Sequence, residues 1–259
     1  MNQDKPKTGG GGKRRMIEQA ERKKRHPIFR LFWTLFWLGF PKHKVFGLST
    51  VPKDRPAVFV ANHAGAYGPV AMITSFHRRF RPWVISNMCS LRTAPAHLAK
   101  DLFPAKTRVG KAFSFLISAI VAPLAVLVMY AVEAIPVYKD ARVITTFNKS
   151  LRTLLGGTNV LIFPENDEPF SEYTNNFSGG FLYIARRYYE ETGRRLEYYP
   201  VFASSKYHAI KVGTPLTYDP SDDFAQQKVR AANYLRDSVT CMARELEIEK
   251  TAKTKKSGA

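Results

Sequence analysis

The sequence predicts an α/β protein in which helices flank a mixed, largely parallel sheet. Short apolar runs rich in β-branched residues alternate with amphipathic segments of helical periodicity, which is the pattern of layered α/β folds. Polar clusters follow three of these runs directly, at the carboxyl ends of the expected strands, where α/β sheets bind ligands. A dense aromatic segment precedes the globular part, so we also expect an N-terminal interfacial helix.

The globular part is expected to span residues 45–248. Expected strands cover residues 56–61, 83–85, 134–138, 160–163, 198–201 and 209–212. Expected helices cover residues 69–76, 97–103, 147–155, 177–193 and 225–246, with glycines ending two of them. The length of 259 residues fits one such domain with extensions at both ends.

The N-terminal extension has two parts. Residues 1–25 combine a glycine run with a basic tract and predict a disordered basic tail. Residues 26–44 predict an amphipathic helix at a membrane interface, because Phe, Trp and Leu are dense there and lysines follow. The apolar run is shorter than the roughly 20 residues that cross a bilayer as a helix. Residues 249–259 predict a second basic tail.

A second apolar segment lies inside the globular part, at residues 112–132. It carries no charge and is long enough for a transmembrane helix. If this helix crossed the membrane, however, the residues before it and the residues after it would lie on opposite sides of the bilayer, although both are needed at one site. Pro123 near its middle fits a kinked or re-entrant helix. We expect a helix embedded in the membrane without crossing it; a buried core helix is the alternative.

The formal net charge of +19 predicts an anionic partner, either acidic lipid headgroups or nucleic-acid phosphates. The N-terminal aromatic residues are contiguous with leucine rather than interleaved with basic residues, which favours a membrane surface and no nucleic acid. Cys89 and Cys241 fit no metal or disulfide spacing. We therefore expect a reducing compartment, no metal site and no bound cofactor; the sequence carries no signal for an oligomeric state.

The polar clusters at the strand ends are Asn62-His63, Lys139 to Arg142, and Glu165 with its neighbours. Their order and spacing resemble the glycerolipid acyltransferases, the lysophosphatidate acyltransferase family, over roughly residues 45–245. The family's first motif, Asn-His followed after four residues by Asp, resembles Asn62-His63 through Gly68, and its second, an apolar strand ending in a cation, resembles Ile135 to Lys139. Its third, Phe-Pro-Glu-Gly-Thr-Arg, resembles Phe163 to Glu168, and the Phe-Lys-x-Gly that follows resembles Phe177 to Gly180. Its fourth, a Pro-Val pair, resembles Pro200-Val201.

The resemblance implies acyl transfer from an acyl thioester, either acyl-CoA or acyl carrier protein, to a lipid hydroxyl such as that of a lysophospholipid. It makes His63 the general base, with Asn62 as the second catalytic residue. It assigns substrate binding to Lys139, Arg142, Glu165, Asn166, Ser178 and Gly179. The thioester is then a co-substrate, and the protein is expected at an anionic membrane surface with its active site on the cytoplasmic face.

Three positions depart from the family's pattern. Gly68 stands where the family has the Asp that orients the histidine, Glu168 replaces an Arg that binds phosphate, and Ser178 replaces a Lys. The alternative is therefore a catalytically weakened or inactive lipid-binding relative on the same fold; a basic nucleic-acid-binding protein is the less favoured third reading. We expect His63→Ala to abolish transfer and Gly68→Asp not to reduce it.

Overall fold

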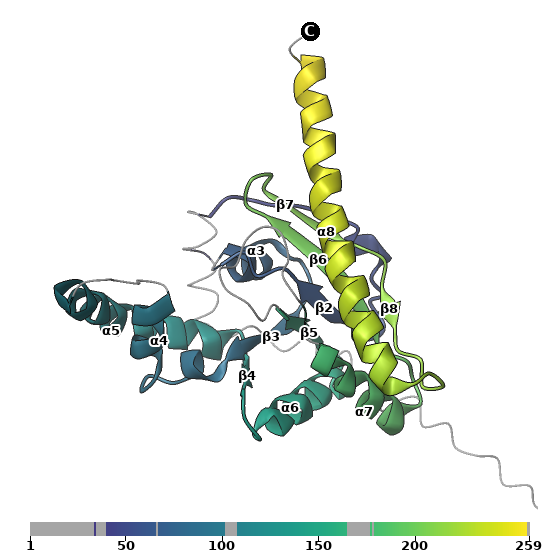
Figure 1. The fold of residues 1–259 in the computed structure, drawn as a ribbon, viewed down its shortest axis with the longest axis horizontal. Coiled ribbons are helices and arrows are strands. Elements are labelled where there is room, and N and C mark those ends of the chain that lie inside the picture. The colour runs from purple at the N-terminus through teal and green to yellow at the C-terminus, as the bar shows by residue number, and fades with distance from the viewer. Residues whose placement is uncertain are drawn as a thin grey trace, which may run out of the picture.

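The computed structural model describes residues 34, 40–65, 67–101, 108–164, 177 and 179–257 (Figure 1). In this part of the chain the strands are β1 (Lys44–Phe46), β2 (Val58–Ala61), β3 (Phe80–Ile85), β4 (Ile135–Val137), β5 (Asn159–Ile162), β6 (Glu197–Ser204), β7 (Ala209–Val212) and β8 (Leu216–Thr217). The α-helices are α3 (Tyr67–Ser75), α4 (Ala94–Asp101), α5 (Arg108–Ala131), α6 (Val143–Leu155), α7 (Leu182–Thr192) and α8 (Phe224–Ser257). Short 3-10 helices are η1 (Leu48–Thr50), η2 (Ser86–Cys89) and η3 (Gly179–Phe181). The expected tail at 1–25 and most of the expected helix at 26–44 lie outside these residues.

The described strands form one sheet in the order β1-β7-β6-β2-β5-β3-β4, with β8 beside β6. Strands β6, β2, β5, β3 and β4 are parallel, and β7 is antiparallel to β6, which confirms the predicted mixed, largely parallel sheet. Parallel strands end at the same edge of a sheet. The residues that follow β2, β5 and β4 therefore share its carboxyl edge, with β2 and β5 adjacent and β4 two strands beyond β5.

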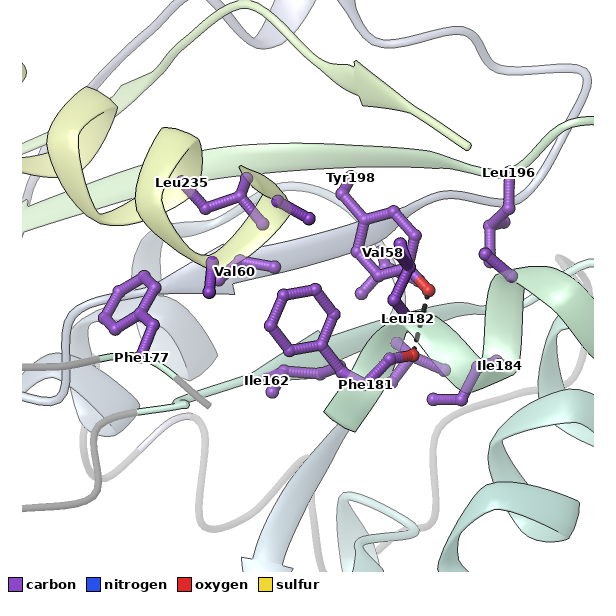
Figure 2. Close-up of a cluster of buried hydrophobic side chains, with 14 of the residues drawn as sticks. Val58, Val60, Ile162, Phe177, Phe181, Leu182, Ile184, Leu196, Tyr198 and Leu235 are labelled. Atoms are coloured by element: carbon purple, nitrogen blue, oxygen red, sulfur yellow. Dashed lines mark hydrogen bonds between the residues drawn. The ribbon is translucent and has the colours of Figure 1, made fainter. Parts of the chain in front are cut away.

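Helices cover both faces of the sheet because its central strands are apolar on both sides. Val58 and Val60 of β2 face a core that also contains residues of α6, α7 and α8. Phe59 and Ala61, which point to the opposite face, share a second core with residues of α3. Figure 2 shows the first of these cores, where β2 and β5 meet the start of α7 and the middle of α8.

Helix α8 begins over this core and then extends beyond the sheet (Figure 1). Its backbone is helical to Ser257, past residue 248, where the globular part was expected to end. The sequence explains the extension, because residues 249–257 contain good helix formers and no glycine or proline, and Gly258 follows.

Helices α4 and α5 form a pair that projects to one side of the domain (Figure 1). Buried Ala94 and Leu98 of α4 pack against buried Ala122 of α5, and α5 continues through Pro123 without a break. The outer face of α5 exposes a stripe of large apolar side chains, namely Phe113, Leu116, Ile120, Leu124 and Leu127. By length and composition alone, Gly110–Ala131 is able to cross a membrane. The exposed stripe favours a membrane-embedded helix over the buried core helix that was the alternative for this segment.

Two neighbouring tyrosines of β6 allow a comparison of a buried hydroxyl in the first core with a hydroxyl bonded to a partly exposed carboxylate. The Tyr198 hydroxyl is fully buried and donates a hydrogen bond to the Phe181 carbonyl oxygen at 3.1 Å (Figure 2), whereas the Tyr199 hydroxyl donates to the partly exposed Glu197 carboxylate. Tyr198→Phe removes this buried hydrogen bond and is expected to lower the free energy of unfolding by about 1–1.5 kcal/mol. Tyr199→Phe is expected to cost less than about 1 kcal/mol, because water replaces its partner. Denaturant unfolding of both variants measures this; equal losses would contradict it.

Candidate functional site

Asn62 fixes the carboxyl end of β2. Its side chain is fully buried and forms two hydrogen bonds with Ala203 of β6: Asn62 Nδ2 donates to the Ala203 carbonyl oxygen at 3.0 Å, and the Ala203 N–H donates to Asn62 Oδ1 at 2.8 Å. The amide thus continues the β2–β6 pairing by one residue after the last strand register, Ala61 with Val201. The position predicted as catalytic holds the strand end in place, and His63 follows it directly.

A tight turn carries the chain from His63 into α3. Ala64 and Gly65 both adopt left-handed backbone conformations, with φ of 45° and 62°. The Tyr67 N–H then donates to the Ala64 carbonyl oxygen at 3.3 Å, and the Gly68 N–H to that of His63 at 3.2 Å. A left-handed conformation is strained for alanine and costs of order 1–3 kcal/mol, so the surrounding contacts must hold the turn in shape. The strained residue is the one that follows the predicted base.

The His63 imidazole lies against the end of β5. Its ring centroid is 5.3 Å from that of Phe163, at an interplanar angle of 68°, so the Asn-His motif and the Phe-Pro motif meet at one edge of the sheet. Burial lowers the pKa of His63 below its ordinary value of 6.5, because desolvation disfavours the imidazolium; a hydrogen bond with the Gly65 backbone opposes part of this effect. The imidazole is therefore neutral at pH 7, as a general base must be.

Gly68 packs against the backbone of the same two residues. A Cβ atom at this position would lie 2.4 Å from the His63 carbonyl oxygen and 2.7 Å from that of Asn62. A carboxylate side chain therefore requires a shift of the turn that carries His63. This contact argues against the sequence-based expectation that Gly68→Asp leaves transfer unreduced, which stays a prediction.

The second polar cluster lies at the far side of the carboxyl edge. Strand β4 is three strands from β2, which corresponds to about 14 Å. Arg142 is exposed, forms an ion pair with Asp140 at 2.7 Å and stacks over the Tyr138 ring at 4.6 Å. The hydrogen bonds from Arg142 lower the pKa of Asp140 to about 2, so this carboxylate is committed to Arg142. Lys139 and Arg142 share an edge with His63 but are not in its immediate surroundings.

The remaining predicted binding residues divide into two groups. Glu165, Asn166 and Ser178 lie outside the described residues, so their positions stay predictions. Gly179 is described, and a Cβ there would lie 2.4 Å from the Lys228 carbonyl oxygen of α8. Close packing of η3 against α8 accounts for this glycine without a substrate.

Sequence reasoning missed a polar cluster beneath the start of α3. The Tyr67 hydroxyl hydrogen-bonds His43 Nε2 and, at 3.2 Å, His208 Nδ1, while His43 Nδ1 lies 3.1 Å from the Ser75 hydroxyl. Burial, and next the neighbouring His208, lower the pKa of His43. These contacts anchor both ends of α3, the helix that follows the His63 turn. The cluster joins three distant segments, and no local sequence pattern signals it.

Neither a family model nor a curated protein matches this chain. Among solved structures, the chain is similar to the crystal structure of the 1-acyl-sn-glycerophosphate (LPA) acyltransferase, PlsC, from Thermotoga maritima, with a TM-score of 0.52. The similarity covers 89% of this chain and 79% of that chain, at 16% sequence identity. The domain described above has the fold of that acyltransferase.

Proposed function

We propose that the protein transfers an acyl group from an acyl thioester to a lipid hydroxyl, with His63 as the general base. The observation that carries this proposal is a partly buried imidazole, its pKa lowered by burial, at the carboxyl edge of a sheet whose fold is similar to that of an LPA acyltransferase. Ligands bind and react at this edge in α/β sheets. The fold alone would not support the proposal, because one fold hosts many chemistries.

The proposed reaction needs one proton acceptor. As the acceptor hydroxyl oxygen attacks the thioester carbonyl carbon, the hydroxyl proton moves to the neutral His63 imidazole. The carbon–sulfur bond then breaks, and the imidazolium returns the proton to the leaving thiolate, so that atoms and charge balance. Base assistance of this kind contributes typically ~10²–10⁴-fold to the rate. Burial favours the neutral form of His63, and glycine at position 68 places no carboxylate there that would raise its pKa.

A membrane location is supported by α5. Its exposed stripe of Phe, Leu and Ile side chains suits the apolar part of a bilayer rather than nucleic-acid phosphates. The strands on either side of the α4–α5 segment pair directly, Trp83 of β3 with Ile135 of β4. The chain therefore returns to the same sheet after α5. We propose that α5 is embedded in one leaflet of the membrane without crossing it, so that both halves of the site stay on the same side.

The alternative is a lipid-binding protein with weak or no transferase activity. Gly68 favours it, because close backbone packing there leaves no room for the carboxylate that the family pattern places next to the histidine. A carboxylate partner helps to hold a catalytic histidine in one orientation and stabilises its charged form. Activity with a panel of lysolipids therefore separates the two candidates.

We predict that His63→Ala lowers acyl transfer by roughly 10²–10⁴-fold, because the proton acceptor is removed. The measurement is release of free thiol from acyl-CoA or acyl carrier protein with lysophosphatidate and other lysophospholipids. His77→Ala, which changes an exposed histidine, is the control and is expected to retain wild-type activity. Undiminished transfer by His63→Ala would refute the role of His63, and no release by the wild-type protein on any acceptor would favour the lipid-binding alternative.

Gly68→Ala is predicted to reduce transfer, because its Cβ displaces the turn that carries His63. Overpacking of this kind typically costs about 1–3 kcal/mol of stability. Gly193→Ala is the matched control: its Cβ meets no atom within 4 Å, but its φ of 66° is strained for alanine. We expect the control to lose about 1–2 kcal/mol while retaining activity. Full activity in Gly68→Ala, measured beside its unfolding curve, would contradict the packing argument.

A further inference from the structure

A cationic pocket lies at the edge of the sheet opposite to His63. It is lined by Pro52, Lys53, Arg55, Arg78, Arg79, Gly157, Thr158 and Asn159 and is open to solvent. These residues precede β2, β3 and β5 or begin them, so they lie at the amino ends of parallel strands. Four of them are basic, and none is acidic.

Two of the four cations are held by carboxylates outside the pocket. Arg55 donates to Glu197 at 2.8 Å, and Arg79 lies 3.5 Å from Glu133, which also accepts a hydrogen bond from Arg81. Asp54, exposed between Lys53 and Arg55, is a further carboxylate nearby. These pairs fix the orientation of the guanidinium groups and neutralise part of their charge.

The other two cations are not neutralised by described residues. Arg78 donates from Nη2 to the Val51 carbonyl oxygen at 2.9 Å, which positions its guanidinium, while its Nε–H is buried without a hydrogen-bond partner among the described residues. Lys53 is exposed and forms no ion pair with them. A guanidinium and an ammonium group that no described carboxylate neutralises suit an anion with several acceptor oxygens.

The pocket is also close to the end of the apolar helix α5. Glu133, which lies 3.5 Å from Arg79, comes two residues after the last residue of α5. Cations beside an apolar, bilayer-facing surface are well placed for the phosphates of lipid headgroups.

We propose that this pocket binds a phosphate group, with Lys53 and Arg78 as its principal ligands, at a site separate from the acyl-transfer edge. The phosphate comes either from an anionic lipid headgroup or from a soluble phosphate compound. Phosphate binding itself is independent of the proposed acyl transfer, whereas a lipid source would also rest on the proposed membrane contact of α5.

The first measurement uses inorganic phosphate and the full-length protein. Phosphate is expected to raise the unfolding temperature of the wild-type protein above that in chloride of equal ionic strength. In Lys53→Gln and Arg78→Gln the affinity is expected to fall roughly tenfold, the effect of losing one charge-assisted hydrogen bond. Arg244→Gln, which removes an exposed cation on α8, is the control and should bind as the wild-type protein does. Equal phosphate affinity in all four proteins would overturn the proposal.

The second measurement identifies the source of the phosphate with vesicles. Vesicles of phosphatidylcholine are compared with vesicles that also contain phosphatidate. If the ligand is a lipid headgroup, Lys53→Gln loses the preference for phosphatidate but still binds both vesicles through α5, whereas Ile120→Glu weakens binding to both. If Lys53→Gln keeps the full preference while losing inorganic phosphate, the ligand is a soluble phosphate compound. Lys53 is exposed, so its variant tests the pocket even where Arg78→Gln perturbs folding.

Discussion

The reciprocal hydrogen bonds between Asn62 and Ala203 are the constraint on which the candidate site depends. They satisfy a fully buried amide and bind the residue that follows β2 to β6. Each such bond contributes a net ~0.5–1.5 kcal/mol, but leaving one partner buried and unsatisfied costs more. The chain leaves the sheet immediately afterwards, through a left-handed turn. The hydrogen bonds of Asn62 therefore help to hold His63 at the carboxyl edge.

The tight turn after β2 explains why glycine stands at position 68. The turn is so tight that α3 begins against the carbonyl oxygens of Asn62 and His63, and only glycine fits there. Tyr67 and its two histidine partners hold α3 from the other side. The His63 ring lies beside Phe163, and burial lowers its pKa. Burial therefore favours the neutral imidazole, whereas a carboxylate partner would favour the imidazolium.

Local patterns predicted the central strands and most helices, because alternation and terminating glycines act over a few residues. Gly156 and Gly193 do end α6 and α7. The order of the strands is not encoded locally, so the distance of Lys139 from β2 could not be predicted. The very short strands β1 and β8, formed only by pairing with β7 and β6, gave no signal. The cationic pocket is likewise assembled from three separate loops.

The proposed role of His63 requires that burial keep its imidazole neutral at the carboxyl edge of the sheet. The most direct measurement is an NMR titration of the His63 ring, assigned by comparison with His63→Ala. The expected midpoint lies below 6.5, because burial disfavours the protonated form. A midpoint at or above 6.5 would show either a solvated ring or a carboxylate partner, and would contradict it.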